Sequence, residues 1–190
     1  MPHPPTQKKA WIETGYQYFA RNGPEKLKIK DIAHEAGVSR TTFYHFFTDL
    51  QDLIDHLLEY HREIAEQYFT EQKKCKTYDP DLFRLAEAFQ IGICFHQQLL
   101  LHKENPIYYL TYQVLNKISN EIIYPLWAEY FGYHGNSFVG KEIHLMLLDI
   151  WYLNIKPEDI SYDSLRNNAK EIKRQVELFA NSHHLQKLGK

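Results

Sequence analysis

The sequence has few of the features that disulfide-bonded, membrane-spanning or β-sheet proteins require. It holds two cysteines, Cys75 and Cys94, and no CxxC pair, which indicates neither a disulfide framework nor a zinc knuckle. No apolar run approaches the roughly 20 residues of a membrane span. Valine occurs only four times, and no stretch of six residues alternates between apolar and polar side chains. These absences favour a soluble, all-α protein without a membrane partner.

Signals of catalysis are also missing. No nucleophile, base and orienting group occur at an informative spacing, and no Gly-rich loop is present to hold a phosphate. Cys94 and His96 lie two positions apart and would not share a helical face, so a hydrogen-bonded core or pocket histidine is favoured over a metal ligand. We therefore expect no enzyme activity, no catalytic residue, no cofactor and no metal site. Residues 1–5 lack the apolar core of a signal peptide, which predicts a cytoplasmic protein.

Charge is distributed unevenly along the chain. The formal net charge is −2 at pH 7, but residues 1–47 hold seven Lys or Arg against four Asp or Glu, a balance of +3. The remaining residues therefore carry −5. A basic head joined to an acidic body is typical of a phosphate-binding module attached to a separate domain.

Start and stop signals divide the first part of the chain into helices. Gly23-Pro24 ends the first helix, Ser39 caps the third, and Thr48 or Asp49 caps the fourth. The four helices are expected at residues 6–22, 29–36, 40–47 and 50–73.

Prolines mark the later helices. Asp79-Pro80 and Asn105-Pro106 each place a capping side chain before a proline, which predicts the start of a helix at both sites. The first of these helices carries one continuous apolar seam at Leu82, Ala86, Phe89, Ile93, His96 and Leu100. Pro125 is expected to kink or break the second. A turn at residues 132–135 and two helices at residues 136–154 and 163–184 complete the expected all-α chain.

The most informative stretch is residues 30–47, KDIAHEAGVSRTTFYHFF. Ile32 and Ala33 are suited to packing the second helix, and Gly37 supplies a left-handed turn. Ser39 caps a third helix that can enter the major groove of DNA. The large aromatic residues of the region are expected in the core rather than as stacking platforms: Trp11, Phe19, Phe43 and Phe47.

Polar residues of this third helix are candidates for DNA contact. Arg40 and Thr41 can reach base edges or phosphate. Thr42 and Tyr44 offer hydroxyls at phosphate distance, and His45 can donate to phosphate. For Tyr44, a position covering the core is an equal alternative.

Residues 8–58 resemble the DNA-binding domain of the TetR/AcrR family of bacterial regulators. The resemblance rests on Phe-x-x-x-Gly at residues 19–23, Asp-Ile-Ala-x-x-Ala-Gly-Val-Ser at 31–39 and Thr-Phe-Tyr-x-x-Phe at 42–47. It implies that Lys30 and the first turn of the third helix read bases, and that Thr42, Tyr44 and His45 hold phosphates. The residues expected to contact DNA are Lys28, Lys30, Ser39, Arg40, Thr41, Thr42, Tyr44 and His45.

Two positions depart from the family pattern. Lys28 stands where the family usually has Thr or Ser at the start of the second helix, and Leu50 stands where the family favours a Lys at the start of the fourth. Lysine can still neutralise a phosphate, but leucine cannot. Loss of one charged anchor is expected to weaken DNA binding and to lower its salt dependence by about one unit.

The resemblance also implies that residues 49–190 form a helical body that binds an effector and dimerises, behind a DNA-binding domain at residues 1–48. The apolar seam faces an aromatic-rich stretch and forms either plain core or an effector pocket. The pocket would be lined by Phe89, Ile93, His96, Tyr108, Tyr112, Trp127 and Trp151. The dimer interface would be formed by Leu145, Leu148, Leu165, Ile172, Val176 and Phe179.

These observations predict a ligand-responsive transcriptional regulator. It would bind a palindromic operator in double-stranded DNA as a homodimer, act as a repressor, and be released by a largely apolar small molecule. An alternative left open is a non-enzymatic module whose helical head docks a protein partner.

Overall fold

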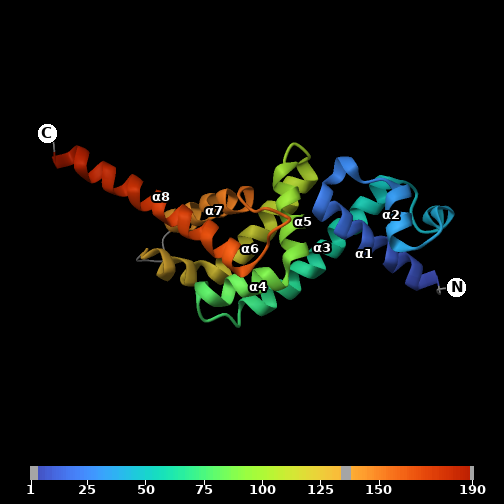
Figure 1. The fold of residues 1–190 in the computed structure, drawn as a ribbon, viewed down its shortest axis with the longest axis horizontal. Helices are drawn as coiled ribbons and strands as arrows, with labels where there is room; N and C mark the ends of the chain where they lie inside the picture. Colours follow the sequence, from blue (N-terminus) through green and yellow to red (C-terminus); the bar gives the residue numbers. More distant parts are fainter. Residues whose placement is uncertain (1–3, 134–137, 189–190) are drawn as a thin grey trace. The chain divides into compact units, whose positions relative to one another are not determined.

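The computed structural model describes the backbone of residues 4–133 and 138–188 and the side chains of residues 6–133 and 138–178. These residues form helices and no strand, which confirms the all-α prediction (Figure 1). The longer helices are α1 (Pro4–Asn22), α2 (Ile29–Ala36), α3 (Leu50–Gln72), α4 (Phe83–Ala88), α5 (Gln90–Leu101), α6 (Pro106–Phe131), α7 (Phe138–Leu153) and α8 (Tyr162–Leu188). Three short helical segments lie between them: η1 (Pro24–Lys26), η2 (Arg40–His45) and η3 (Tyr78–Leu82).

The chain folds into two compact units. The head unit comprises Met1–Thr70 and Phe89–Leu115, and the body unit comprises Glu71–Ala88 and Asn116–Lys190. Within the head unit, α1 packs against both α2 and α5. Within the body unit, α8 packs against α4 and α7. The domain boundary expected at residue 48 lies inside the head unit and stays a prediction about function.

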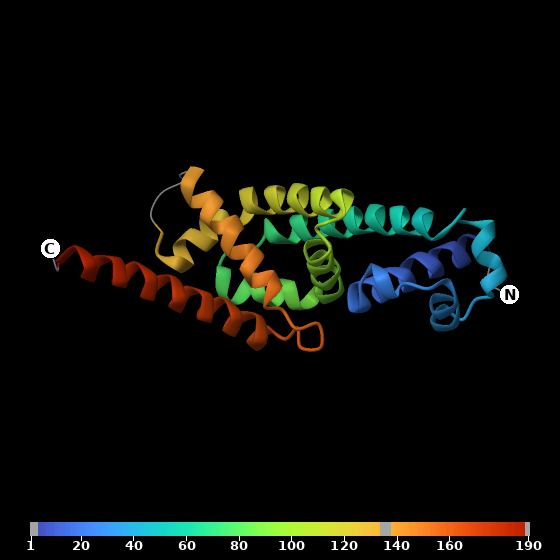
Figure 2. The ribbon, with the colours of Figure 1, turned by 90° about the horizontal axis from the view of Figure 1, so that it is seen from above.

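Stacked aromatic rings form the core of the head unit. Trp11, Phe19, Phe43 and Phe47 are all buried, as the sequence predicts. Helix α5 lies beside α1 (Figure 2). The ring centroid of Phe95 of α5 is 4.3 Å from that of Phe19 of α1. Because these aromatic residues come from separate helices, their burial holds the helix-turn-helix on the rest of the head unit.

A helical run begins near Asp79-Pro80, since η3 leads directly into α4, but Asp79 does not cap it. Asp79 has an extended backbone (φ −122°, ψ 117°), and Thr77 occupies the capping position instead. The Asp79 carboxylate accepts hydrogen bonds from the Tyr162 hydroxyl at 2.6 Å and from Nε of Arg166 at 2.7 Å. A side chain that binds α8 in this way is not available to cap its own helix, and α4 begins only at Phe83.

The sequence predicts a single helix along the seam from Leu82 to Leu100, but the structure has two helices there, α4 and α5. Phe89 separates α4 from α5 with a backbone outside the helical range (φ −101°, ψ 25°). Its ring packs edge-on against Tyr68 of α3, with centroids 5.2 Å apart. The seam residues are apolar and face inward, but an apolar periodicity does not reveal an interruption of the backbone.

Pro125 does not break α6, which runs unbroken from Pro106 to Phe131. Pro125 and Glu121 are both exposed. The Glu121 carbonyl that loses its helical donor can therefore bond to water, and this lowers the cost of the proline. The start at Asn105 is confirmed, since its side chain accepts from the Ile107 N–H at 2.9 Å. Gly135 and Asn136, at the expected turn and the next helix start, lie outside the described residues.

Candidate nucleic-acid interface

The turn of the helix-turn-helix is built as predicted. Gly37 adopts the left-handed conformation (φ 64°, ψ 29°) and ends α2. The Val38 N–H then donates to the Ala33 carbonyl at 3.0 Å, which satisfies an otherwise open group at the end of the helix. A side chain at position 37 would strain this conformation, so glycine fixes the angle at which the chain leaves α2.

The recognition segment is shorter and tighter than expected. It is a 3-10 helix over Arg40–His45 rather than an α-helix to Phe47. The predicted cap is present: Ser39 Oγ accepts from the Thr41 N–H at 3.4 Å. In a 3-10 helix, side chains three positions apart align, so Thr41 and Tyr44 lie one above the other.

Thr42 stabilises the recognition segment through hydrogen bonds inside the head unit. Its hydroxyl donates to the Ser39 carbonyl at 2.6 Å and accepts from Nε1 of Trp11 at 3.2 Å. The hydroxyl proton is therefore already used inside the head unit. The prediction that Thr42 holds a phosphate stays untested, and the geometry gives this residue a positioning role. The bond from Trp11 was not visible in the sequence, because the two residues are 31 positions apart.

The other predicted DNA-contacting residues are exposed. Tyr44 is 62% exposed, and its ring also lies edge-on to buried Phe43 at 5.2 Å, so it is open to a partner while it contacts the core. A single surface segment presents five of the predicted side chains, and the amino end of α2 presents two more. The exposed residues are Lys28, Lys30, Ser39, Arg40, Thr41, Tyr44 and His45.

The amino end of α2 is suited to an anion. Lys28 occupies the cap position, and its side chain makes no capping hydrogen bond. The first amides of α2 therefore point outward beside Lys28 and Lys30, where the helix dipole also favours negative charge. That Lys28 and these amides hold a phosphate, in place of the Thr or Ser of the family pattern, stays a prediction.

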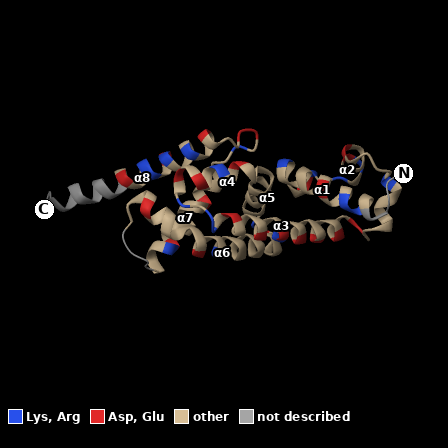
Figure 3. Ribbon diagram, turned by 90° about the horizontal axis from the view of Figure 1, so that it is seen from below, with Lys and Arg blue, Asp and Glu red and all other residues tan. Residues whose placement is uncertain are grey.

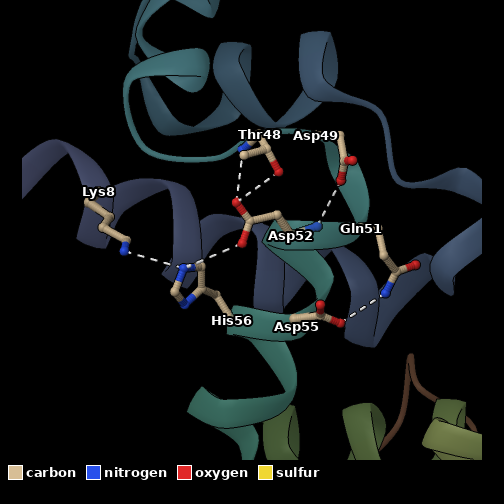
Figure 4. Close-up of polar contacts among 7 residues, drawn as sticks. All are labelled: Lys8, Thr48, Asp49, Gln51, Asp52, Asp55 and His56. Atoms are coloured by element: carbon tan, nitrogen blue, oxygen red, sulfur yellow. Dashed lines mark hydrogen bonds and ion pairs between the residues drawn. The ribbon is translucent and has the colours of Figure 1, made fainter.

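The end of the recognition segment is tied to the start of α3 (Figure 4). Asp52 Oδ2 accepts from the Thr48 N–H at 2.8 Å, and Asp49 Oδ1 accepts from the Asp52 N–H at 3.0 Å. The bond to Asp49 Oδ1 confirms Asp49 as a cap of α3, and Asp52 in turn binds the residue before the cap. The bond from the Thr48 N–H lowers the pKa of the Asp52 carboxyl.

Lys8 of α1 joins the same cluster. Its Nζ lies 3.3 Å from Nε2 of His56 and 5.6 Å from the centre of the Phe47 ring. Asp52 Oδ1 lies on the other side of the His56 nitrogen, at 3.8 Å (Figure 4). The cluster therefore connects α1 and α3 directly behind the recognition segment.

The negative charge of helix α3 would repel phosphate. Figure 3 shows acidic residues along its length, and Leu50 at its start leaves it without the expected charged anchor. Its acidic side chains are Asp52, Asp55, Glu59, Glu63, Glu66 and Glu71, against the single arginine Arg62. The positive charge that can meet DNA therefore comes from the residues before α3.

A buried chain of hydrogen bonds links α1 to α3 and α5. The Tyr16 hydroxyl lies 2.8 Å from Nδ1 of His61, and Nε2 of His61 lies 3.0 Å from Nδ1 of His96. His96 also stacks on Tyr112, with ring centroids 4.7 Å apart. A hydrogen-bonded core histidine, favoured by the sequence for His96, is thus what the structure shows. His61 was missed, because nothing local in the sequence marks it.

The predicted pocket residues fall in two groups. Those of the head unit are Phe89, Ile93, His96, Tyr108 and Tyr112. Trp127 and Trp151 belong to the body unit, where both line a cavity. Whether any of the seven contacts an effector stays a prediction.

Half of the predicted dimer residues are buried inside their own chain. Leu148, Leu165 and Ile172 are at most 9% exposed and belong to the core of the body unit. Leu145 is half-buried and Val176 is exposed, while Phe179 lies outside the described side chains. The sequence identified apolar seams on these helices but not which side of each helix faces inward.

The turn, the recognition segment and the exposed cations define a helix-turn-helix DNA-binding domain. Residues 12–57 match the family model described as bacterial regulatory proteins, tetR family. The resemblance predicted from the motif is therefore confirmed at residues 12–57, which match the DNA-binding domain of TetR-family transcriptional regulators.

Solved structures similar to this chain share its fold. A transcriptional regulator from Aquifex aeolicus VF5 is 18% identical, with a TM-score of 0.59 over 91% of this chain and 99% of that one. A TetR-family regulator from Mesorhizobium loti MAFF303099 is 13% identical, with a TM-score of 0.54 over 92% and 96%. One from Streptomyces coelicolor is 18% identical, with a TM-score of 0.54 over 93% and 96%. No curated protein sequence matches the chain.

The family model and the three structures named above are those of transcriptional regulators. In the part of the chain that the structure describes, no helix is both long and apolar enough to cross a bilayer.

Proposed function

We propose that the protein is a ligand-responsive repressor that binds a palindromic operator as a homodimer in the cytoplasm. The observation that carries the proposal is the exposed recognition segment Arg40–His45 on a domain of the TetR family. Two such heads related by a two-fold axis would read two half-sites. A small molecule would release the operator by binding more tightly to the state whose heads do not fit it.

The DNA upstream of the protein's own gene provides the test. Fluorescence anisotropy at several salt concentrations should show specific binding of the wild-type protein. Arg40→Ala should reduce affinity about 10- to 100-fold and lower the salt slope by about one unit. Tyr44→Ala should also weaken binding. Lys156→Ala removes an exposed lysine from the body unit and is the matched control, which should bind as wild type.

Absence of binding to this DNA at low salt would contradict the proposal. It would favour the alternative in which the helical head docks a protein. Equal losses for Arg40→Ala and Lys156→Ala would mean that binding follows total charge and not the recognition segment.

For the dimer, the exposed apolar side chains of α7 and α8 support a surface different in detail from the predicted one. Met146, Ile150 and Leu153 are spaced by four and three positions on α7, and Met146 is 57% exposed. Val176 and Leu178 are exposed apolar residues of α8. Apolar side chains in this number on adjacent helices are suited to a second copy of the chain.

Light scattering on the purified protein tests this surface. Met146→Glu together with Ile150→Glu should produce a monomer at micromolar concentration. Leu110→Glu replaces an equally exposed leucine of α6 and should leave the dimer intact. A wild-type monomer, or dissociation by Leu110→Glu alone, would show that the surface lies elsewhere.

A further inference from the structure

The start of α3 offers no cation to DNA, although it directly follows the recognition segment. Leu50 is the first residue of α3 and cannot neutralise a phosphate. Asp49 and Asp52 lie at the same place, and both carboxylates accept hydrogen bonds from backbone amides there. A phosphate that approaches the end of the recognition segment would therefore meet negative charge, unless another helix brings a cation close by.

Lys8 of α1 is a cation at this place. Its Nζ lies 5.6 Å from the centre of the Phe47 ring and 3.3 Å from Nε2 of His56. Trp11, one turn further along the same face of α1, donates through Nε1 to the Thr42 hydroxyl at 3.2 Å. The face of α1 that carries Lys8 is therefore the face that packs on the recognition segment.

The charge of Lys8 is not used in an ion pair. Among the side chains that the structure describes, no carboxylate lies within ion-pair distance of Lys8 Nζ. The partner of Lys8 is His56 Nε2, which must be the acceptor because an ammonium can only donate. The adjacent Lys9 differs, since its Nζ lies 3.6 Å from a carboxylate oxygen of Glu13.

The contacts around Lys8 also restrict where its side chain lies. Figure 4 shows Lys8 on one side of the His56 nitrogen and Asp52 on the other. Asp52 is itself fixed, because Oδ2 accepts from the N–H of Thr48 at 2.8 Å and from its hydroxyl at 3.2 Å. A lysine that is already held in place loses less rotamer freedom when it binds a ligand. Lys8 is only half-buried, which leaves part of its side chain accessible.

We propose that Lys8 binds a DNA phosphate beside the end of the recognition segment. It would thereby supply, from α1, the charged anchor that Leu50 does not supply at the start of α3. The ammonium has further N–H groups besides the one that His56 accepts, and phosphate oxygens are suited to accept them. Such a contact adds affinity and fixes position on the duplex without reading sequence. The inference rests on the DNA-binding function proposed above.

The salt dependence of binding to the DNA upstream of the protein's own gene tests this contact. Lys8→Met keeps an unbranched side chain beside Phe47 and removes the charge, so the salt slope in fluorescence anisotropy should fall by about one unit. The loss of affinity should accordingly be about tenfold at about 50 mM salt and about threefold at about 200 mM. Lys8→Arg keeps the charge and should keep the wild-type slope.

Lys9→Met is the matched control, because it removes the same charge from the next residue of α1, where Lys9 already pairs with Glu13. Its salt slope should be that of the wild type. Equal changes of slope for Lys8→Met and Lys9→Met would overturn the proposal, since binding would then follow total charge. A Lys8→Met variant that loses stability in urea but keeps the wild-type slope would also overturn it, because Lys8 would then serve the fold alone.

The wild-type protein decides the matter if Lys8→Met does not fold. Acetylation by acetic anhydride, located by tandem mass spectrometry, should be slowed by the DNA at Lys8 and unchanged at Lys9. Protection of both lysines or of neither would overturn the Lys8 contact, and DNA binding that depends on Arg40 would leave the proposed function intact. A wild-type protein that does not bind this DNA at low salt would overturn both.

Discussion

The head unit and the body unit both bury a histidine, but they satisfy it differently. In the head unit, His61 uses both ring nitrogens, one toward Tyr16 and one toward His96. In the body unit, His144 uses Nδ1 for Asn120, and Nε2 has no partner among the described residues. Within the described residues, the head unit thus satisfies both nitrogens of His61, and the body unit leaves one nitrogen of His144 without a protein partner.

The same distinction applies to the recognition segment. The Thr42 hydroxyl donates to Ser39 and accepts from Trp11, whereas the side chains of Arg40 and Tyr44 are exposed. The internal hydrogen bonds give Thr42 a positioning role, and DNA contact by its exposed neighbours stays a prediction. The predictions below test this division, beginning with the variant of largest effect.

His61→Phe should lower the free energy of unfolding by about 3 kcal/mol, because it removes two buried hydrogen bonds at once. His144→Phe should cost less, about 1–2 kcal/mol, because it leaves the buried Asn120 Oδ1 without a donor but also removes an unsatisfied nitrogen. Urea unfolding monitored by circular dichroism measures both. Equal losses of unfolding free energy for His61→Phe and His144→Phe would show that the two histidines do not differ in how they stabilise the fold.

Acid should destabilise the protein through both histidines. Burial lowers the pKa of His61 well below its usual value and that of His144 to about 3, so the folded state binds fewer protons than the unfolded state. Their contribution is complete above about pH 6.5 and is lost as pH falls toward the folded-state pKa. Below pH 6.5 each can contribute a slope of up to about 1.4 kcal/mol per pH unit.

Urea unfolding at pH 7.5, 6.0 and 5.0 measures this slope. His144→Phe should reduce it, because one of the two groups no longer titrates, and His34→Phe, at an exposed position, should not. A variant that lacks His144 but keeps the wild-type slope would assign the acid sensitivity to other groups.

Local signals in the sequence predicted local structure well. Gly37, Ser39, Asp49 and Asn105 act through the conformation of one residue or through bonds to amides up to three positions away, and all four were identified. Such interactions depend on spacing along the chain, which the sequence states directly.

Pairs that are distant in sequence were not predictable. Asp79 was expected to cap a helix but binds Tyr162 and Arg166 more than 80 positions away. His144 was not identified at all, because its role depends on Asn120 of another helix and on the rings that surround it. The spacing of apolar residues predicts which face of a helix is buried. It does not predict which other helix packs against that face.

The smallest expected effects separate Thr42 from Tyr44. Thr42→Val keeps the shape of the side chain and removes its bonds to Ser39 and Trp11, so it should cost about 1 kcal/mol of unfolding free energy. Tyr44→Phe removes an exposed hydroxyl, so it should leave stability within about 0.5 kcal/mol of wild type and weaken DNA binding about three- to tenfold.

Measuring both quantities on both variants makes the result decisive. If the division is correct, the stability loss of Thr42→Val exceeds that of Tyr44→Phe, and the loss of DNA affinity at a temperature where both are folded runs in the opposite order. If Thr42→Val instead loses more affinity than Tyr44→Phe while fully folded, the Thr42 hydroxyl exchanges its internal bond for a phosphate when DNA binds. Internal satisfaction in the free protein would then no longer distinguish residues that fold the head from residues that read DNA.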